Sequence, residues 1–344
     1  MKRNLYEKLI IKLRGRFLDL ARNTPFQYGA YASYWHYRLQ KIFNNSSGPA
    51  RGSVQYIAQK PNYSAGIGHQ LANWNAGYYF AGYYQVHFAH FPFSGKKWEA
   101  LLGFGENETT AHSLLKDRSF KKRRLPRFNS EKKEEITLIA NIIASYKKKK
   151  VFFLLEQDQG YMEQCGTAAS LSKKFFMAAA RQENKLFYDP RQLNIAIHIR
   201  RGDIVSMKQS NKSNWEQRWL NNDYYAAVLK NVLAALSLPA KTAIYIFSQG
   251  HENDFPEFKQ FNGIHYCLDV NAYDSFVHLV YADILISSKS SFSYKPALIS
   301  KGIKICPADF WHRYPGCPDF ILAADDGNFD GGELAKELKK RIPV

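Results

Sequence analysis

The sequence predicts an α/β protein of two domains, on the basis of its length, its composition and the alternation of strands and helices in its second half. With 344 residues the chain is too long for one ordinary core and suits two domains of typical size. Hydrophobic residues make up 45% and charged residues 23%, which is a globular composition. Apolar strands alternate with amphipathic helices after residue 190, which predicts a parallel sheet covered on both faces. We therefore expect an N-terminal α/β domain over residues 1–190 and a C-terminal Rossmann-type domain over 191–344, which the family resemblance described below assigns to the acceptor side and to the donor.

The second half shows the clearer periodicity. Strands are predicted there at 193–199, 241–247, 264–268, 284–287 and, as the final strand, 302–306. Helices are predicted at 223–235, 272–282, 293–300 and 331–340. Asp223 is placed to cap the first of these helices. In the first half, strands are predicted at 53–58, 85–89 and 151–155, and helices at 69–84, 131–146 and 170–182.

Positive charge is the second marked property. Lys and Arg number 48 against 30 Asp and Glu, and the resulting net charge of +18 attracts polyanions. Nucleic acid, an anionic membrane surface and a phosphate-bearing substrate all fit this field. The clusters at 121–124 and 147–150 are equally well explained as solvated surface runs. Charge therefore does not identify the partner.

The N-terminal segment has the pattern of a basic amphipathic helix. Leu5, Leu9, Leu13 and Phe17 recur every four residues among Lys and Arg. Such a helix could lie on an anionic membrane or pack on its own domain. No stretch has the ~20 apolar residues that span a bilayer, and no signal peptide is evident. The four cysteines lack C-x-x-C spacing, so we expect a reducing compartment: a cytoplasmic protein, peripheral on the inner face of a membrane if the helix binds there.

The strongest local feature follows the strand that begins at residue 193. His198, Arg200, Arg201, Gly202 and Asp203 come at its carboxyl end, where ligands of parallel sheets bind. Guanidinium is a planar, permanently charged donor that suits phosphate, and Asp203 could brace it. His198 and Arg200 share one face of the strand, and Arg201 points the other way. A strand edge followed by a solvated turn is the alternative.

Two further turns could hold an anion. A serine-rich segment, Ser287–Ser293, lies between a strand and a helix, and Lys289 adds charge to it. Gly66 and Gly68 precede a helix and let the backbone approach a ligand closely, although their spacing is not a dinucleotide fingerprint. An ordinary polar connection and a plain turn are the alternatives. The three segments fall in two predicted domains, and a cleft between those domains would bring them together.

These three segments resemble those of the GDP-fucose-dependent fucosyltransferases, which comprise α1,2, α1,6 and protein O-fucosyltransferases. The family's histidine-x-arginine-arginine-x-aspartate segment is matched by His198, Arg200, Arg201 and Asp203. Its Gly-x-Gly-Asn-Gln turn is matched by Gly66, Gly68 and Gln70. Its third block is matched by Asp274, Asp283 and Ser290–Ser293.

The resemblance implies a GT-B-like architecture of two Rossmann-type domains facing across a cleft. Arg200 would hold the β-phosphate and polarise the leaving oxygen, with Asp203 supporting it. His198 and Asp274 would lie near the guanine, and Ser290 and Ser291 would contact the phosphates. The other matched residues expected at the donor are Arg201, Phe292, Gly66, Gly68 and Gln70. Family members invert the anomeric centre without a metal, so we expect neither a metal nor a cofactor. The chain also has no convincing Asp-x-Asp motif. We interpret Asp325 and Asp326 as surface residues.

The chain departs from the family pattern at two places. His69 stands where the family often has asparagine, and it could donate to phosphate or act as the base toward the acceptor hydroxyl. Tyr294, Lys295 and Pro296 stand where α1,2 enzymes have tryptophan, which disfavours an α1,2 linkage. Alternative bases are Glu156, Asp158 and Glu163.

The sequence thus predicts an inverting, metal-independent transfer of fucose from GDP-fucose to a hydroxyl of an acceptor glycan, which could be lipid-linked. A transferase that uses a different nucleotide sugar is the first alternative. A basic nucleic-acid-binding protein is an alternative from another class, but no nucleic-acid motif is found and no specific nucleic acid is expected.

Overall fold

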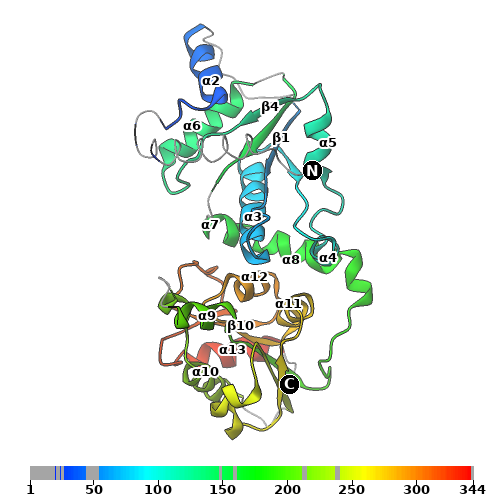
Figure 1. The fold of residues 1–344 in the computed structure, drawn as a ribbon, viewed down its shortest axis with the longest axis vertical. Helices are drawn as coiled ribbons and strands as arrows, with labels where there is room; N and C mark the ends of the chain where they lie inside the picture. The colour runs from blue at the N-terminus through cyan, green and yellow to red at the C-terminus, as the bar shows by residue number, and fades with distance from the viewer. Residues whose placement is uncertain are drawn as a thin grey trace. The chain divides into compact units, whose positions relative to one another are not determined.

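The computed structural model describes residues 20, 24, 27–43, 54–146, 149–157, 161–210, 215–236 and 241–341. The helix predicted from Leu5 to Phe17 lies outside the described residues, as do Lys147 and Lys148. The chain forms two compact units, each with its own parallel sheet (Figure 1). The first unit holds residues 1–61, 73–91 and 107–160, and the second holds 62–72, 92–106 and 161–344. The units are therefore not the two continuous segments, 1–190 and 191–344, expected from the sequence.

The first unit is built on a five-stranded parallel sheet of order β3-β2-β1-β5-β4. Its strands are β1 (Gln55–Gln59), β2 (His87–His90), β3 (Thr109–Thr110), β4 (Lys121–Arg124) and β5 (Val151–Leu155). Its helices are α2 (Ala32–Phe43), α5 (Ala111–Lys116), α6 (Lys133–Ala144) and residues 73–83 of α3 (Ile67–Tyr83). Alternate residues of β1 enter different cores: Ile57 packs with Ile139 of α6, and Ala58 packs with Leu114 of α5.

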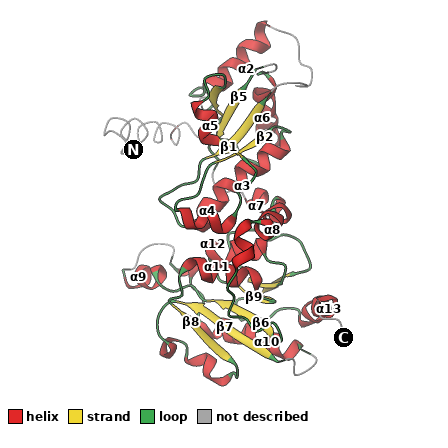
Figure 2. Cartoon of the chain, turned by 90° about the vertical axis from the view of Figure 1, so that its right-hand side faces the viewer, coloured by secondary structure: helices red, strands yellow, loops and turns green. Residues whose placement is uncertain are grey.

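The second unit is built on a six-stranded parallel sheet of order β11-β10-β9-β6-β7-β8 (Figure 2). Its strands are β6 (Leu193–His198), β7 (Thr242–Ser248), β8 (Ile264–Leu268), β9 (Ile284–Ile286), β10 (Ile303–Pro307) and β11 (Phe320–Ala323). Its helices are α4 (Lys96–Leu102), α7 (Tyr161–Gly166), α8 (Ala168–Met177), α9 (Asp203–Gln209), α10 (Asn222–Ala235), α11 (Ala272–Tyr281), α12 (Ser291–Ile299) and α13 (Gly331–Arg341). Short 3-10 turns lie at Ala179–Glu183, Glu216–Arg218, Glu252–Asp254 and Pro256–Gln260.

Both faces of this second sheet are covered by helices. Ile195 and Ile197 of β6 pack in one core with residues of α10 and α13, and Ala196 packs in the other with residues of α11 and α12. The alternation of side chains along the strand explains this division. The α/β class and the two Rossmann-type parallel sheets are therefore confirmed.

The strand order places a topological switch point between β6 and β9. The chain runs from β6 outward through β7 to β8, returns to pair β9 with β6 on the other side, and continues to β10 and β11. The connections on the two sides of β6 and β9 diverge, and in doubly wound sheets such a divergence places a crevice at the carboxyl ends of the two strands; we call this position the crevice. Ligands of doubly wound sheets bind at this place.

Three details of the sequence prediction are wrong. The residue that precedes α10 is Asn221, and Asp223 lies inside the first turn, because the helix begins one residue earlier than expected. β10 is not the final strand, since β11 pairs with it. The basic run Lys121–Arg124 is a strand of the first sheet rather than only a solvated surface run.

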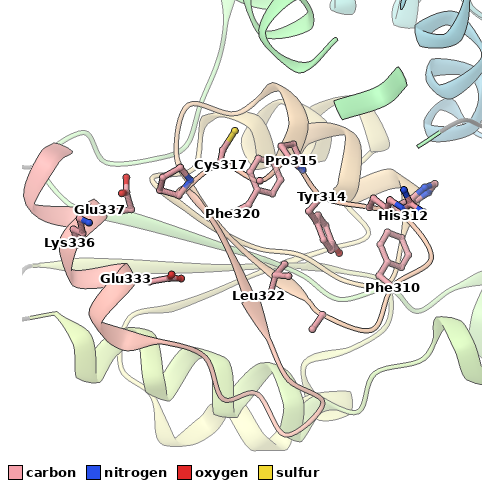
Figure 3. Close-up of a pocket in the computed structure, with 14 residues that line it drawn as sticks. Phe310, His312, Tyr314, Pro315, Cys317, Phe320, Leu322, Glu333, Lys336 and Glu337 are labelled. Atoms are coloured by element: carbon pink, nitrogen blue, oxygen red, sulfur yellow. The ribbon is translucent and has the colours of Figure 1, made fainter. Parts of the chain in front are cut away.

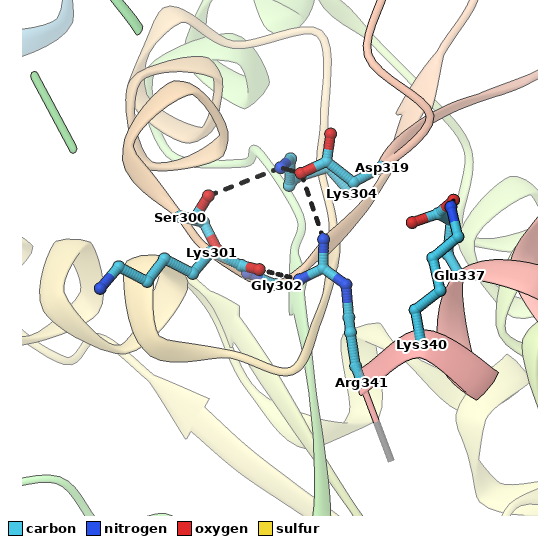
Figure 4. A network of polar contacts seen from close by, with 8 residues as sticks. All are labelled: Ser300, Lys301, Gly302, Lys304, Asp319, Glu337, Lys340 and Arg341. Carbon is cyan, nitrogen blue, oxygen red and sulfur yellow. Dashed lines mark hydrogen bonds and ion pairs between the residues drawn. The ribbon is translucent and has the colours of Figure 1, made fainter. Parts of the chain in front are cut away.

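A buried polar network fastens the C-terminal helix to the amino end of the second sheet. Figure 4 shows Lys304 of β10 and Arg341 of α13 converging on the Asp319 carboxylate. Arg341 also donates to the Lys301 carbonyl. The Lys304 side chain is almost fully buried, so its ammonium depends on this carboxylate.

Candidate functional site

Arg200 lies at the switch point of the second sheet, two residues beyond the end of β6. Its side chain is 18% exposed and forms an ion pair with Asp203, whose carboxylate is 63% exposed. Nη2 donates to Oδ2 at 2.8 Å and Nε to Oδ1 at 3.4 Å, so the carboxylate braces one edge of the guanidinium. Nη1 donates to the Lys289 carbonyl at 3.5 Å. A guanidinium has five N–H groups, so these bonds leave donors for a ligand.

Gly202 shapes the turn between Arg200 and Asp203. Its φ of +49° lies in the left-handed region that favours glycine. A Cβ at this position would overlap the side-chain oxygen of Gln249, which follows β7. The backbone conformation therefore favours the glycine between Arg201 and Asp203, and a larger residue would also displace the flexible end of the Gln249 side chain.

His198 connects the two strands of the switch point. Its Nδ1 lies 2.8 Å from the Ser288 hydroxyl, which belongs to the segment after β9. Burial lowers the pKa of His198 to about 3, and the cations of Arg200 and Arg201 add to this effect. The imidazole is therefore neutral at pH 7, and it links the β6 and β9 loops by a hydrogen bond rather than by charge.

Arg201 points away from Arg200, as the alternation of the strand predicts. Its guanidinium donates to the Arg200 carbonyl at 2.8 Å and to Asn222 of α10. It also stacks over Trp219, with 4.1 Å between the guanidinium carbon and the ring centre. Arg201 is buried in these contacts, so it positions the Arg200 backbone and does not face the crevice.

The serine-rich segment forms the start of α12. The Ser290 hydroxyl accepts from the Phe292 amide at 3.2 Å and caps the helix. The next residue, Ser291, lies with its hydroxyl 2.8 Å from His312 Nε2. This arrangement places two hydroxyls at the positive end of a nine-residue helix.

Lys289 is the residue whose role the sequence did not reveal. Its side chain is only 7% exposed, and its ammonium lies 2.9 Å from Asp309 and 3.7 Å from Asp325. These carboxylates follow β10 and β11, and both are exposed, so Asp325 is a surface residue as expected that also faces the Lys289 ammonium. Lys289 and Arg200 are thus both ion-paired with exposed carboxylates, and each has N–H groups beyond these bonds.

The glycine turn lies against the start of α12, within the same unit as Arg200. A Cβ on Gly68 would come 2.6 Å from the Ser291 carbonyl oxygen, so only glycine permits this approach. The charge of His69 contributes to the lowered pKa of His312, although burial and Lys295 lower it more. The three predicted segments are thus brought together inside one unit. The expectation that they come from two domains is wrong for this reason.

Gln70 is occupied by structural hydrogen bonds. Its amide nitrogen donates to the Ala65 carbonyl at 2.8 Å and to the Ser94 hydroxyl at 2.5 Å, and its oxygen accepts from the Ser94 amide at 2.8 Å. The side chain is buried. Gln70 therefore holds the turn that carries Gly66 and Gly68.

Asp274 and Phe292 lie in the first turns of two neighbouring helices, α11 and α12. Asp274 is exposed in the first turn of α11, and its carboxylate accepts from Asn271 at 2.7 Å. The Phe292 ring lies 5.4 Å from the His198 ring and 5.9 Å from the Phe276 ring. Asp283, by contrast, precedes β9 at the opposite edge of the sheet, where it accepts from the Asn194 amide at 2.8 Å.

A buried lysine lies inside α12. Lys295 is 1% exposed and donates to the Gln164 side chain. Burial lowers the pKa of Lys295 to about 7. The charge of Lys295 in turn lowers the pKa of His312, which reaches about 3 mainly because of burial.

An open pocket of about 730 Å³ adjoins this region through His312 (Figure 3). Phe310 and Tyr314 line it on one side, and Glu333 and Lys336 of α13 line it on the other. Arg200 and Asp203 do not line it. The pocket is thus a neighbour of the crevice at the switch point and not the crevice itself.

Of the three alternative bases, the structure describes the side chain of Glu156. Glu156 pairs with Arg124 in the first unit at 2.9 Å. Asp158 and the side chain of Glu163 lie outside the described residues. Among the residues that the structure describes, no group of three or more His, Cys, Asp or Glu could hold a metal ion. All four cysteines are free thiols.

Comparison with known proteins gives a distant structural likeness. No family model and no curated protein matches the chain. Solved structures that match include POFUT1 in complex with GDP, with 11% identity, a TM-score of 0.44 and coverage of 76% of this chain and 99% of that one. POFUT1 in complex with GDP-fucose matches with 13% identity, a TM-score of 0.43 and coverage of 81% and 99%. At such identities and TM-scores the likeness carries no argument for function.

Proposed function

We propose that the chain is an inverting, metal-independent glycosyltransferase that moves fucose from GDP-fucose to a hydroxyl of an acceptor glycan. The observation that carries the proposal is Arg200, which lies at the switch point of a doubly wound sheet with guanidinium donors left for a ligand. The start of α12 supports it, because a helix N-terminus with two hydroxyls favours phosphate oxygens. The contact of Gly68 with Ser291 also supports it, because it joins two of the sequence segments that resemble the fucosyltransferases within the unit that holds Arg200.

In the proposed reaction the acceptor oxygen attacks the anomeric carbon of fucose from the face opposite the diphosphate. The bond between that carbon and the β-phosphate oxygen breaks, and its electron pair leaves with GDP. Arg200 donates to the departing oxygen and neutralises the charge that develops there. Asp203 keeps the guanidinium oriented. A lysine in place of Arg200 is flexible and could not be held in the same orientation.

The proton of the acceptor hydroxyl needs a base, and we assign His69 to this role. His69 lies in the first turn of α3, next to the glycine that touches Ser291. It is half-exposed, so an acceptor can reach it. His198, which is neutral, and Ser290, whose hydroxyl caps α12, would then bind the donor. Ser291 and Phe292 would lie beside them.

The same proposal includes two further points. The acceptor glycan could be lipid-linked, and the protein is located in the cytoplasm, on the inner face of a membrane. Within the described part of the chain, no helix is long and apolar enough to cross a bilayer.

The test combines a nucleotide panel with variants of Arg200. GDP and GDP-fucose should raise the melting temperature and bind in calorimetry, and UDP should not. Arg200→Ala should lower kcat for fucose transfer by about 10²- to 10³-fold, and Arg200→Lys by at least about 10-fold. The matched control is Arg191→Ala, which removes an equal charge from an exposed side chain before β6. Transfer by Arg200→Lys at the wild-type rate would refute the role of the planar guanidinium, and preference for UDP would indicate another nucleotide sugar.

A further inference from the structure

Helix α2 of the first unit leaves a wide apolar stripe uncovered. Trp35, Leu39, Ile42 and Phe43 are 53%, 52%, 68% and 76% exposed. Their spacing of four, seven and eight residues from Trp35 places them on one face of the helix. A contiguous group of large exposed apolar side chains marks an interaction site on a protein surface. We call these four residues the α2 stripe.

The opposite face of α2 already holds the helix in place. The Ser33 hydroxyl donates to the Arg124 carbonyl of β4 at 2.6 Å. Tyr34 and Tyr37 pack against the core beneath α6, and the His36 ring stacks on Tyr146 with 3.9 Å between centres. The α2 stripe is therefore not needed to dock α2 on its own unit.

Cations surround the α2 stripe. Residues 32–43 contain no Asp or Glu, and Arg38 and Lys41 are exposed on the helix. Lys121, Arg123 and Lys149 lie close enough to His36 to help burial lower its pKa to about 4. Lys149 donates to His36 Nε2 at 3.1 Å. Among the ion pairs of the described residues, none neutralises Lys121, Arg123 or Lys149.

We propose that the α2 stripe, with the cations Arg38 and Lys121 beside it, docks the protein on an anionic membrane surface. An apolar helix face enters the boundary between headgroups and acyl chains, and flanking lysine and arginine side chains reach the anionic headgroups. Trp35 suits this boundary, since its indole N–H is already bonded to the Gly29 carbonyl at 2.8 Å and its ring is half-exposed. Nucleic acid would use the cations but not the apolar stripe. This inference does not depend on the proposed transferase activity, whose residues lie in the second unit.

The test is co-sedimentation of the full chain with vesicles of phosphatidylcholine, alone or mixed with phosphatidylserine. The wild type should bind the mixed vesicles, and its binding should fall with added salt. The double variant Ile42→Ser with Phe43→Ser should bind about 10-fold more weakly, because it removes the most exposed half of the stripe. Its matched control is Met177→Ser, which changes an apolar side chain of the second unit that is 72% exposed. The control should bind like the wild type.

The charge is tested separately with Arg38→Gln and Lys121→Gln together. This pair should weaken binding to the mixed vesicles on the order of 10-fold. The control pair Lys230→Gln and Lys259→Gln removes two exposed cations from the second unit and should have no effect. Circular dichroism and thermal unfolding verify that each variant is folded. The inference is overturned if the wild type does not bind mixed vesicles, if both stripe and control variants bind equally, or if the stripe instead mediates a dimer in light scattering.

Discussion

Replacing Gly68 by alanine tests whether the glycine turn and the start of α12 form one site. The added Cβ would lie 2.6 Å from the Ser291 carbonyl oxygen and 2.8 Å from its carbonyl carbon. Both atoms are backbone, so no side-chain rotation relieves the contact. The turn and the helix must separate by about 0.8 Å to restore the 3.4 Å of ordinary contact. The His69 ring and the hydroxyls at the start of α12 would then no longer keep their present positions relative to each other.

Two opposing effects set the size of the change. Overpacking of this kind costs about 1–3 kcal/mol, whereas alanine in a helix gains about 0.5–1 kcal/mol over glycine. We therefore expect Gly68→Ala to lower the free energy of unfolding by about 1–2 kcal/mol in urea titrations. The misplaced turn should also slow fucose transfer by about 10-fold or more, since reacting groups tolerate little displacement.

The matched control is Gly82→Ala, near the other end of α3. A Cβ there meets no atom within 4 Å, and the residue has no positive φ. This variant should keep or slightly raise the free energy of unfolding and leave transfer unchanged. If Gly68→Ala behaves like Gly82→Ala in both measurements, the turn does not press on Ser291 and the site as described is wrong.

Two further predictions concern Gly202 and Lys295. Gly202→Ala should lower the free energy of unfolding by about 1–2 kcal/mol, because alanine is strained at the positive φ of this position. Urea unfolding at the wild-type midpoint would contradict this. Burial lowers the pKa of Lys295 from 10.5 to about 7, so between these values the unfolded chain binds one more proton than the folded chain. The stability of the wild type should therefore rise with pH across this window, by at most ~1.4 kcal/mol per pH unit, relative to Lys295→Met. The free energies of unfolding of the two proteins are compared in urea at pH 7 and pH 9. An equal change in both proteins would show that Lys295 does not titrate abnormally.

Local patterns were enough to predict most of the second sheet. Apolar runs such as 264–268 and 284–286 end at polar residues, so their limits agree with the structure to within about a residue. β11 was missed because its four residues follow a loop rich in proline and glycine and carry little periodicity. The short helices α2 and α5 were missed because α2 exposes its apolar residues and α5 spans only six residues.

The site was predictable where it depends on the end of one strand. Arg200 and Asp203 follow β6 directly, so their position at the sheet edge required only the strand itself. The partners of Lys289 could not be foreseen, because Asp309 and Asp325 reach it through the adjacency of β9, β10 and β11. The contact of Gly68 with Ser291 likewise depends on tertiary packing between segments more than 200 residues apart.

Hydrogen–deuterium exchange with and without GDP tests the location of the nucleotide most directly. If the crevice between β6 and β9 binds GDP, peptides that cover 199–204 and 287–294 should gain protection together. Peptides that cover 189–193, at the opposite edge of the same sheet, should not change. Protection at 189–193, or GDP binding that leaves the segments around Arg200 and Ser290 unprotected, would contradict the account.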